Sequence, residues 1–247
     1  MIIMKKLCLL LLLALLSVNV NAQKTYAVIT AVSRYQNSQA NLSYTTKDAK
    51  ALKKVFDNQG AIVSITTSSN ATSENIQKKL KAAAQLAKPE DKIIFFFSGH
   101  GDTGGILTYD MKLLMYKDMI EILSKSKAKE IVCFVDACLS GSVASLADDN
   151  YSWAGGYTHP GLIFVMSSRA EELSIENGWV GHGFFSQALL KGIRGMCDSN
   201  QDKKITLIEL FDYIYKDVTA RTQNYEQVQH PQLIGPRSMH NAIISSW

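Results

Sequence analysis

Short apolar runs alternate with segments of helical periodicity along most of this 247-residue chain. The runs that we predict to be strands are Tyr26–Val32, Ala61–Thr67, Ile93–Phe97, Ile131–Val135 and Leu162–Met166. The predicted helices are Thr45–Gln59, Thr72–Lys88, Tyr116–Ser126, Phe184–Ile193 and Leu207–Arg221. Strands and helices in this order predict an α/β fold with three layers, in which helices cover both faces of a mainly parallel sheet. The stretch Ser140–Pro160, rich in Ser, Gly and Asp, is predicted to be a long surface loop.

The first 22 residues have the pattern of a secretory signal. Lys5 and Lys6 precede an apolar run from Leu7 to Leu16, and small residues stand at the expected cleavage site, Val20-Asn21-Ala22. The alternative is a membrane anchor, but this run is shorter than the roughly 20 residues that span a bilayer. We therefore predict a signal peptide at 1–22 and one domain at 23–247, exported to a periplasm or secreted without a membrane attachment.

Charge argues against two classes of partner. Removing residues 1–22 takes away two lysines and no acid, which lowers the formal net charge from +4 to +2. A charge this small does not favour binding to nucleic acid or to an anionic membrane surface.

The exported chain would keep three cysteines, Cys133, Cys138 and Cys197. An odd number leaves at least one free thiol, and the spacings match neither a disulfide framework nor a zinc site. Cys133 lies inside a predicted strand and is expected in the core, and Cys197 is expected to be a structural thiol. Cys138 follows the end of a strand, where a reactive thiol could face a ligand.

Two predicted strands run directly into residues that can do chemistry. Ile93–Phe97 leads into a histidine between two glycines, His100, and Ile131–Val135 leads into Cys138. The carboxyl ends of parallel strands meet at one edge of a sheet, so both side chains are expected to face one cleft. A nearby imidazole can accept the proton of a thiol, and the backbone N–H groups of Gly101 and Cys138 are candidate donors to an oxyanion.

These two motifs resemble those of a known family. Ser98-Gly99-His100-Gly101 and Asp136-Ala137-Cys138-Leu139-Ser140-Gly141 are similar to the dyad motifs of caspase-like cysteine peptidases, in the clan of caspases, legumains and clostripain. The second motif is closer to metacaspases and bacterial caspase-like proteins than to animal caspases. The similarity covers most of the exported chain, with further matching stretches at Asn41–Ala49, Met166–Glu176, Gly183–Phe185 and Gln229–Gln232.

The resemblance implies a caspase-like fold and hydrolysis of peptide bonds through a thioester, with His100 and Cys138 as the dyad and no required cofactor. Metacaspase-like members hold Arg or Lys of the substrate with acidic side chains, which match Asp48 and Asp136 here. A buried cation needs such carboxylates. The alternative for Asp48 is an exposed acid near a helix N-terminus, stabilised by the helix dipole.

Two other functions stay open. One is a catalytically silent interaction domain on the same fold, although such relatives usually lack the Cys or the His. The other is a different thiol enzyme using the same acyl chemistry. If the peptidase cleaves after basic residues, it cannot cut itself between Cys138 and Ser168, where there is no Lys or Arg. We therefore expect it to be active as a single chain or to be processed elsewhere.

A possible calcium loop runs from Asp198 to Glu209. Its candidate ligands are Asp198, Asn200, Asp202 and Glu209, but Lys203 replaces the glycine that calcium loops of this kind need. We favour the alternative, a polar loop in which Thr206 and Glu209 cap the following helix.

The remaining histidines have no metal-ligand spacing and are expected at the surface or in loops; they are His159, His182, His230 and His240. Trp153 and Trp179 could line substrate subsites or act as packing aromatics. The sequence does not indicate an oligomeric state.

Overall fold

A computed structural model of the chain describes residues 22–147, 153, 156–172, 176–177 and 182–247. Its centre is a six-stranded sheet in the order β12-β8-β7-β3-β1-β2. Five strands are parallel, and β12 runs antiparallel at the edge beside β8. The strands are β1 (Thr25–Ala31), β2 (Ile62–Thr67), β3 (Lys92–Ser98), β7 (Glu130–Asp136), β8 (Leu162–Met166) and β12 (Gln232–Ile234).

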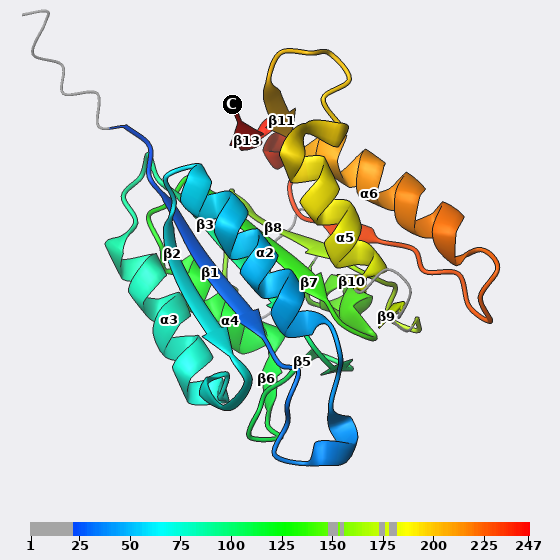
Figure 1. The fold of residues 1–247 in the computed structure, drawn as a ribbon. Coiled ribbons are helices and arrows are strands. Elements are labelled where there is room, and N and C mark those ends of the chain that lie inside the picture. The colour runs from blue at the N-terminus through cyan, green and yellow to red at the C-terminus, as the bar shows by residue number, and fades with distance from the viewer. Residues whose placement is uncertain (1–21, 148–152, 154–155, 173–175, 178–181) are drawn as a thin grey trace, which may run out of the picture.

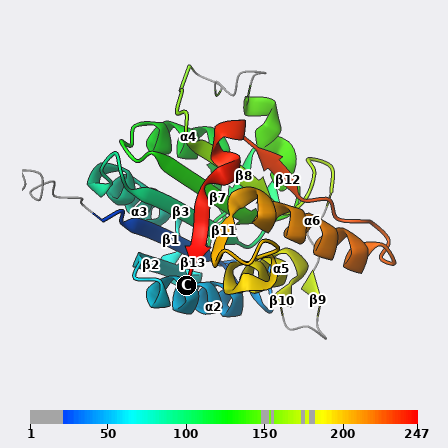
Figure 2. The same ribbon diagram turned by 90° about the horizontal axis from the view of Figure 1, so that it is seen from above.

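Helices cover both faces of this sheet, as predicted (Figure 1). On one face lie α3 (Ser73–Leu86) and α4 (Tyr116–Ser124). On the other face lie α2 (Thr45–Asn58), α5 (Phe184–Lys191) and α6 (Leu207–Thr222), as the view from above also shows (Figure 2). The five helices and five parallel strands begin and end within a few residues of the predicted positions.

Alternation along the strands builds two apolar cores. In β3, Phe95 and Phe97 join the core under α3 and α4, whereas Ile94 and Phe96 join the core under α2, α5 and α6. Every residue of β3 is buried, as the continuous apolar run predicted for a strand covered on both faces. The sheet is therefore held from both sides, and its carboxyl edge is a rigid base for the loops that follow β3 and β7.

Three small sheets were not predicted. One contains β4 (Gly101–Asp102), β5 (Gly105–Leu107) and β6 (Leu113–Met115). The others pair β9 (Glu176–Asn177) with β10 (His182–Gly183), and β11 (Lys204–Thr206) with β13 (Ile243–Ser246). These strands are two to four residues long, too short to show a periodicity in the sequence. The sheet that contains β4 bears on the site, because β4 begins directly after His100.

The prediction that Ser140–Pro160 is a surface loop is wrong for residues 140–143 and for Trp153, whereas Ala144, Ser145, Gly156 and Pro160 are exposed. Ser140–Leu146 forms a 3₁₀-helix that begins with four buried residues. Trp153 is 1% exposed, and its ring centroid lies 5.3 Å from that of Phe164 in β8. Trp153 is thus a packing aromatic. Two buried serines of this segment have polar partners: Ser140 Oγ lies 3.3 Å from Ser168 Oγ, and Ser142 Oγ accepts from the N–H of Gly104 over 3.0 Å.

The predicted signal segment lies outside the described residues except for Ala22. Within the described part of the chain, no helix has the length and apolar character needed to cross a bilayer.

Candidate active site

A small cavity opens at the carboxyl ends of β3 and β7. Its volume is ≈ 70 Å³, and it is lined by Leu42, Thr45, Ser98, Gly99, His100, Asp136, Cys138 and Gly183. The histidine and the cysteine singled out from the sequence therefore share one cavity, together with one of the two predicted acids. The position at the edge of a parallel sheet is where ligands bind in open α/β folds.

Close backbone packing joins the two motifs. The N–H of Gly99 donates to the carbonyl of Asp136 over 3.1 Å. A Cβ atom at Gly101 would lie 2.6 Å from the carbonyl oxygen of Cys138 and 2.9 Å from Cβ of Ala137. A side chain at position 101 would therefore collide with the segment that carries Cys138, which explains the glycine. The sequence pattern did not reveal this reason for Gly101.

His100 is held from two sides by the segment after β1. Its Nε2 lies 2.9 Å from the carbonyl oxygen of Ala40, and its backbone N–H donates to the hydroxyl of Tyr35 over 2.7 Å. The Tyr35 and His100 rings pack with centroids 5.2 Å apart. A carbonyl can only accept a hydrogen bond, so Nε2 carries the hydrogen, and in the neutral ring Nδ1 is the basic nitrogen.

Cys138 differs from the other two described cysteines in its exposure. It is partly exposed on the cavity wall, whereas Cys133 and Cys197 are buried. Burial raises the pKa of the Cys133 thiol well above its usual range, and burial raises the pKa of Cys197 to about 11. Cys133 packs within the core as predicted, and Cys197 donates to the carbonyl of Gly192 over 3.4 Å.

The residue after the nucleophile candidate has an unusual backbone. Leu139 adopts a left-handed conformation with φ of +52°. For a residue other than glycine this conformation costs about 1–2 kcal/mol. It turns the chain from the end of β7 into the 3₁₀-helix, so that Cys138 stands at a sharp corner.

The two predicted acids are both buried but have different positions. Asp136 is 6% exposed and lines the cavity. Its Oδ2 accepts hydrogen bonds from the hydroxyl (2.6 Å) and from the backbone N–H (3.2 Å) of Ser186. Asp48, in the first turn of α2, is 1% exposed, so it is not the exposed helical acid considered as an alternative. It pairs with Nδ1 of His182 and accepts a bond from the N–H of Gly183.

The strand β10 therefore lies over both acids. A Cβ atom at Gly183 would be 2.7 Å from Oδ2 of Asp136, so that only glycine leaves this carboxylate room. Burial lowers the pKa of His182, and the charges of Lys47 and Arg194 act in the same direction. A neutral His182 still donates its Nδ1–H to Asp48. The role of His182 in covering Asp48 was missed, because the two residues are 134 positions apart.

His159 and His230 lie in loops, one of the two locations predicted for them, but each has a specific polar partner. His159 is buried and accepts a hydrogen bond from the N–H of Gly161, and burial lowers its pKa. His230 pairs with the buried Glu172. The described residues contain no group of three or more His, Cys, Asp or Glu side chains that could hold a metal ion. Trp179 lies outside the described residues.

The possible calcium loop has the capping arrangement that we favoured. Thr206 is the N-cap of α6, and its hydroxyl accepts from the N–H of Glu209, whose carboxylate accepts from the N–H of Thr206. Glu209 is thereby used in a capping box, and Lys203 occupies a left-handed position with φ of +63°. Calcium binding by Asp198, Asn200 and Asp202 stays a prediction.

Solved structures show the same fold. Caspase-1 from Spodoptera frugiperda superposes with a TM-score of 0.65 at 17% identity, over 86% of each chain. A protein from Geobacter sulfurreducens gives a TM-score of 0.65 at 14% identity, over 88% of this chain and 97% of that one.

Curated relatives match over shorter segments. A vacuolar-processing enzyme of Glycine max is 37% identical over 91 residues, which are 31% of this chain and 18% of that protein. A legumain of Canavalia ensiformis is 36% identical over 61 residues, 23% of this chain and 13% of that protein. The chain thus aligns with less than a fifth of the length of these relatives.

A family model described as the caspase domain matches residues 24–237 and so takes in every element from β1 to β12. The chain therefore belongs to the caspase-domain family of peptidases.

Proposed function

We propose that this chain is a cysteine endopeptidase that cleaves after Arg or Lys, with Cys138 as the nucleophile and His100 as its acid–base partner. The observation that carries the proposal is the one cavity lined by His100, Cys138 and Asp136. It combines a thiol, an imidazole and a carboxylate, and the rest of its lining consists of Leu42, Thr45, Ser98 and two glycines. Peptide and protein substrates are the expected partners.

The hydrogen bond from His100 to Ala40 supports a specific course of proton transfer. Because Nε2–H donates to the Ala40 carbonyl, Nδ1 can accept the proton of the Cys138 thiol. The thiolate then attacks the carbonyl carbon of the substrate, and the imidazolium gives its proton to the leaving amine. Water hydrolyses the resulting thioester and frees the acid. The imidazolium keeps its bond to Ala40 throughout, which holds the ring in one orientation.

The oxyanion of each tetrahedral intermediate needs donors that are already in place. We assign these donors to the backbone N–H groups of Gly101 and Cys138, which belong to the two segments that pack closely here. Their fixed positions would cost no reorganisation at the moment of reaction.

Asp136 is the side chain that we assign to bind a basic substrate residue. Its carboxylate lines the cavity beside Cys138 and is held rigidly by Ser186. A guanidinium or ammonium group buried there would gain a charge-assisted hydrogen bond. Asp48 lies behind His182 and Gly183, so we assign it a secondary role that adds negative charge to the same region.

Peptide amides ending in Arg, Lys or Asp test this proposal, assayed with and without calcium. We expect turnover of the Arg and Lys substrates, and a loss of at least about 10³-fold in kcat for Cys138→Ala and for His100→Ala. Asp136→Asn should lower kcat/KM for the Arg substrate by about 30-fold or more, because a buried cation loses its paired charge. Asp48→Asn is the matched control and should have a smaller effect.

Undiminished turnover in Cys138→Ala would overturn the proposal. A folded wild-type chain that hydrolyses none of these peptides would instead favour a silent interaction domain on the same fold.

A further inference from the structure

The loop after β8 contacts the residues on both sides of Cys138. The hydroxyl of Ser167 accepts from the N–H of Ala137 over 3.1 Å and donates to the carbonyl of Ala137 over 3.0 Å. Farther along this loop, the backbone carbonyl of Glu172 accepts from the N–H of Leu139 over 2.8 Å. Cys138 is therefore fixed at its preceding and its following residue by the loop 167–172.

These hydrogen bonds constrain the backbone conformation of Leu139. A left-handed backbone at a residue other than glycine persists only where the surrounding structure fixes it. The hydrogen bond from its N–H to Glu172 is such a constraint. If the loop moved, Leu139 could relax, and the corner that directs Sγ of Cys138 into the cavity would change.

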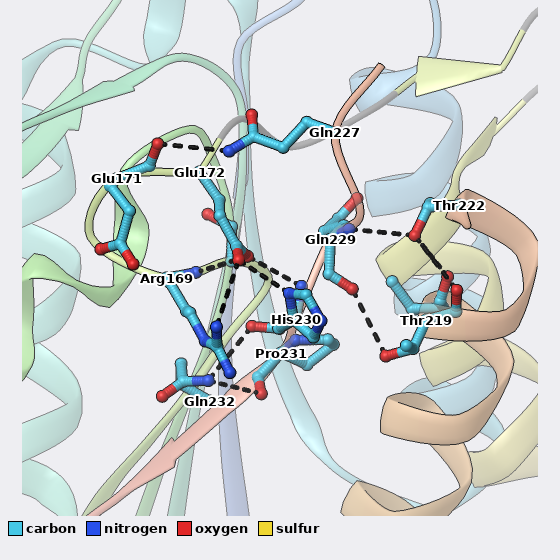
Figure 3. A network of polar contacts seen from close by, with 12 residues as sticks. Arg169, Glu171, Glu172, Thr219, Thr222, Gln227, Gln229, His230, Pro231 and Gln232 are labelled. Carbon is cyan, nitrogen blue, oxygen red and sulfur yellow. Dashed lines mark hydrogen bonds and ion pairs between the residues drawn. The ribbon is translucent and has the colours of Figure 1, made fainter. Parts of the chain in front are cut away.

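The loop 167–172 is itself held by the segment 227–232, which follows α6 (Figure 3). Gln229 is fully buried, and its side-chain amide donates to the carbonyl of Ser167 over 2.7 Å. The N–H of Gln229 donates to the hydroxyl of Thr222 at the end of α6 over 3.0 Å. The segment thus links α6 to the first residue of the loop.

The Glu172 carboxylate makes the second link (Figure 3). Its side chain is 7% exposed. Oε2 accepts from the N–H of Arg169 (3.2 Å) and from the N–H of His230 (2.8 Å), and Oε1 accepts from Nδ1–H of His230 (2.7 Å). The Glu172 carboxylate therefore bonds both to Arg169 within the loop 167–172 and to His230 in the segment 227–232. A buried carboxylate persists only with such partners.

We propose that Glu172 and His230 are positioning residues for the nucleophile, acting through the bond between the Glu172 carbonyl and Leu139. The C-terminal segment 227–232 is then part of the catalytic apparatus, although none of its residues lines the cavity. This inference rests on the proposed role of Cys138.

The test uses Glu172→Gln and His230→Ala, with His230→Asn as the conservative variant because an Asn amide can place a donor near the position of Nδ1. The matched control is Asp91→Asn. Asp91 is also a buried carboxylate that accepts backbone N–H bonds, from Lys24 and Lys88, but it precedes β3 at the opposite end of the sheet. Two properties are measured on each variant besides Tm, the steady-state kinetics and the rate at which iodoacetamide alkylates Cys138.

We expect Glu172→Gln and His230→Ala to lower kcat by about 10- to 100-fold with KM within about twofold, because the reacting group is misplaced while the substrate pocket stays intact. The alkylation rate of Cys138 should change in the same variants, and His230→Asn should recover much of both. Asp91→Asn should lower Tm and leave kcat and the alkylation rate near the wild-type values.

Wild-type values of kcat and of the alkylation rate in folded Glu172→Gln and His230→Ala would overturn the inference. It would also be overturned if Asp91→Asn lost as much kcat and alkylation rate as these variants for the same fall in Tm. The alkylation rate separates this result from failure of the proposed function. If the wild-type chain cleaves no peptide, a changed alkylation rate in Glu172→Gln still supports the positioning of Cys138.

Discussion

The three described cysteines occupy environments that give their thiols different reactivity. Cys133 lies within β7 between two apolar layers, and its raised pKa keeps it protonated. Cys197 is buried beside the acidic loop, and Glu209 adds to the effect of burial on its pKa. Cys138 lies on the wall of the cavity. Because the thiolate is the reactive form, these environments separate one candidate nucleophile from two structural thiols.

Alkylation of the folded protein at pH 8 should therefore modify Cys138 and spare the other two. With a pKa of about 11, only about one Cys197 thiol in a thousand is ionised at that pH. Raising the pH toward 10 should increase labelling of Cys197 before that of Cys133. Peptide mass mapping gives the measurement, and denatured protein, in which all three should react, is the control. Equal labelling of Cys133 and Cys138 in the folded chain would contradict this assignment.

At the scale of elements, the site depends on how closely two strand ends approach. β3 and β7 are neighbours in exact register, with Ser98 opposite Asp136. The chain leaves both strands at the same level, and Gly101 lets the start of β4 lie against the backbone of Cys138. The distance between imidazole and thiol is thus set by backbone packing, which is stiffer than side-chain packing.

Gly101→Ala should for this reason damage activity more than stability. The added Cβ would lie 2.6 Å from the Cys138 carbonyl and must displace the cysteine loop. We expect a loss of about 1–3 kcal/mol in the free energy of unfolding and a fall of about 100-fold in kcat/KM. Denaturant unfolding and the peptide assay give the two values.

Gly60→Ala is the control for this prediction. Gly60 has φ of +76° with open space around it, at the end of α2, so alanine there should cost about 1–2 kcal/mol through the backbone alone. It should leave kcat/KM unchanged. Equal activity in Gly101→Ala and Gly60→Ala would show that the close contact has no role in the site.

At the scale of the whole molecule, the sequence predicted the main sheet well because its signals are local. The run Ile93–Phe97 and the periodicity of Thr45–Gln59 each contain enough residues to identify a strand and a helix. The edge strand β12 and the strands β4, β5 and β6 were missed because two or three residues carry no clear period. The sequence could not decide between packing and a substrate subsite for Trp153, because a Ser- and Gly-rich segment gives no sign of the apolar surface beneath it.

The site was predictable to the same extent. His100 and Cys138 follow directly from two strand ends, and strand order brings them together, whereas Asp136 was identified through the family resemblance. The partners that orient them could not be found in this way. Ala40 acts through a backbone carbonyl, and Glu172 meets His230 across 58 positions. Such contacts depend on how distant loops pack, which no local pattern encodes.

The central claim is that an intact single chain uses Cys138 as the nucleophile in a pocket for basic residues. Its most direct test is the intact mass of the protein spanning residues 23–247 after reaction with a peptidyl-arginyl acyloxymethyl ketone, an irreversible thiol reagent. We predict one adduct per uncut chain, mapped to Cys138, lost in Cys138→Ala and strongly slowed in Asp136→Asn. An adduct that persists in Cys138→Ala, or labelling only of chains cut within residues 139–168, would contradict the account.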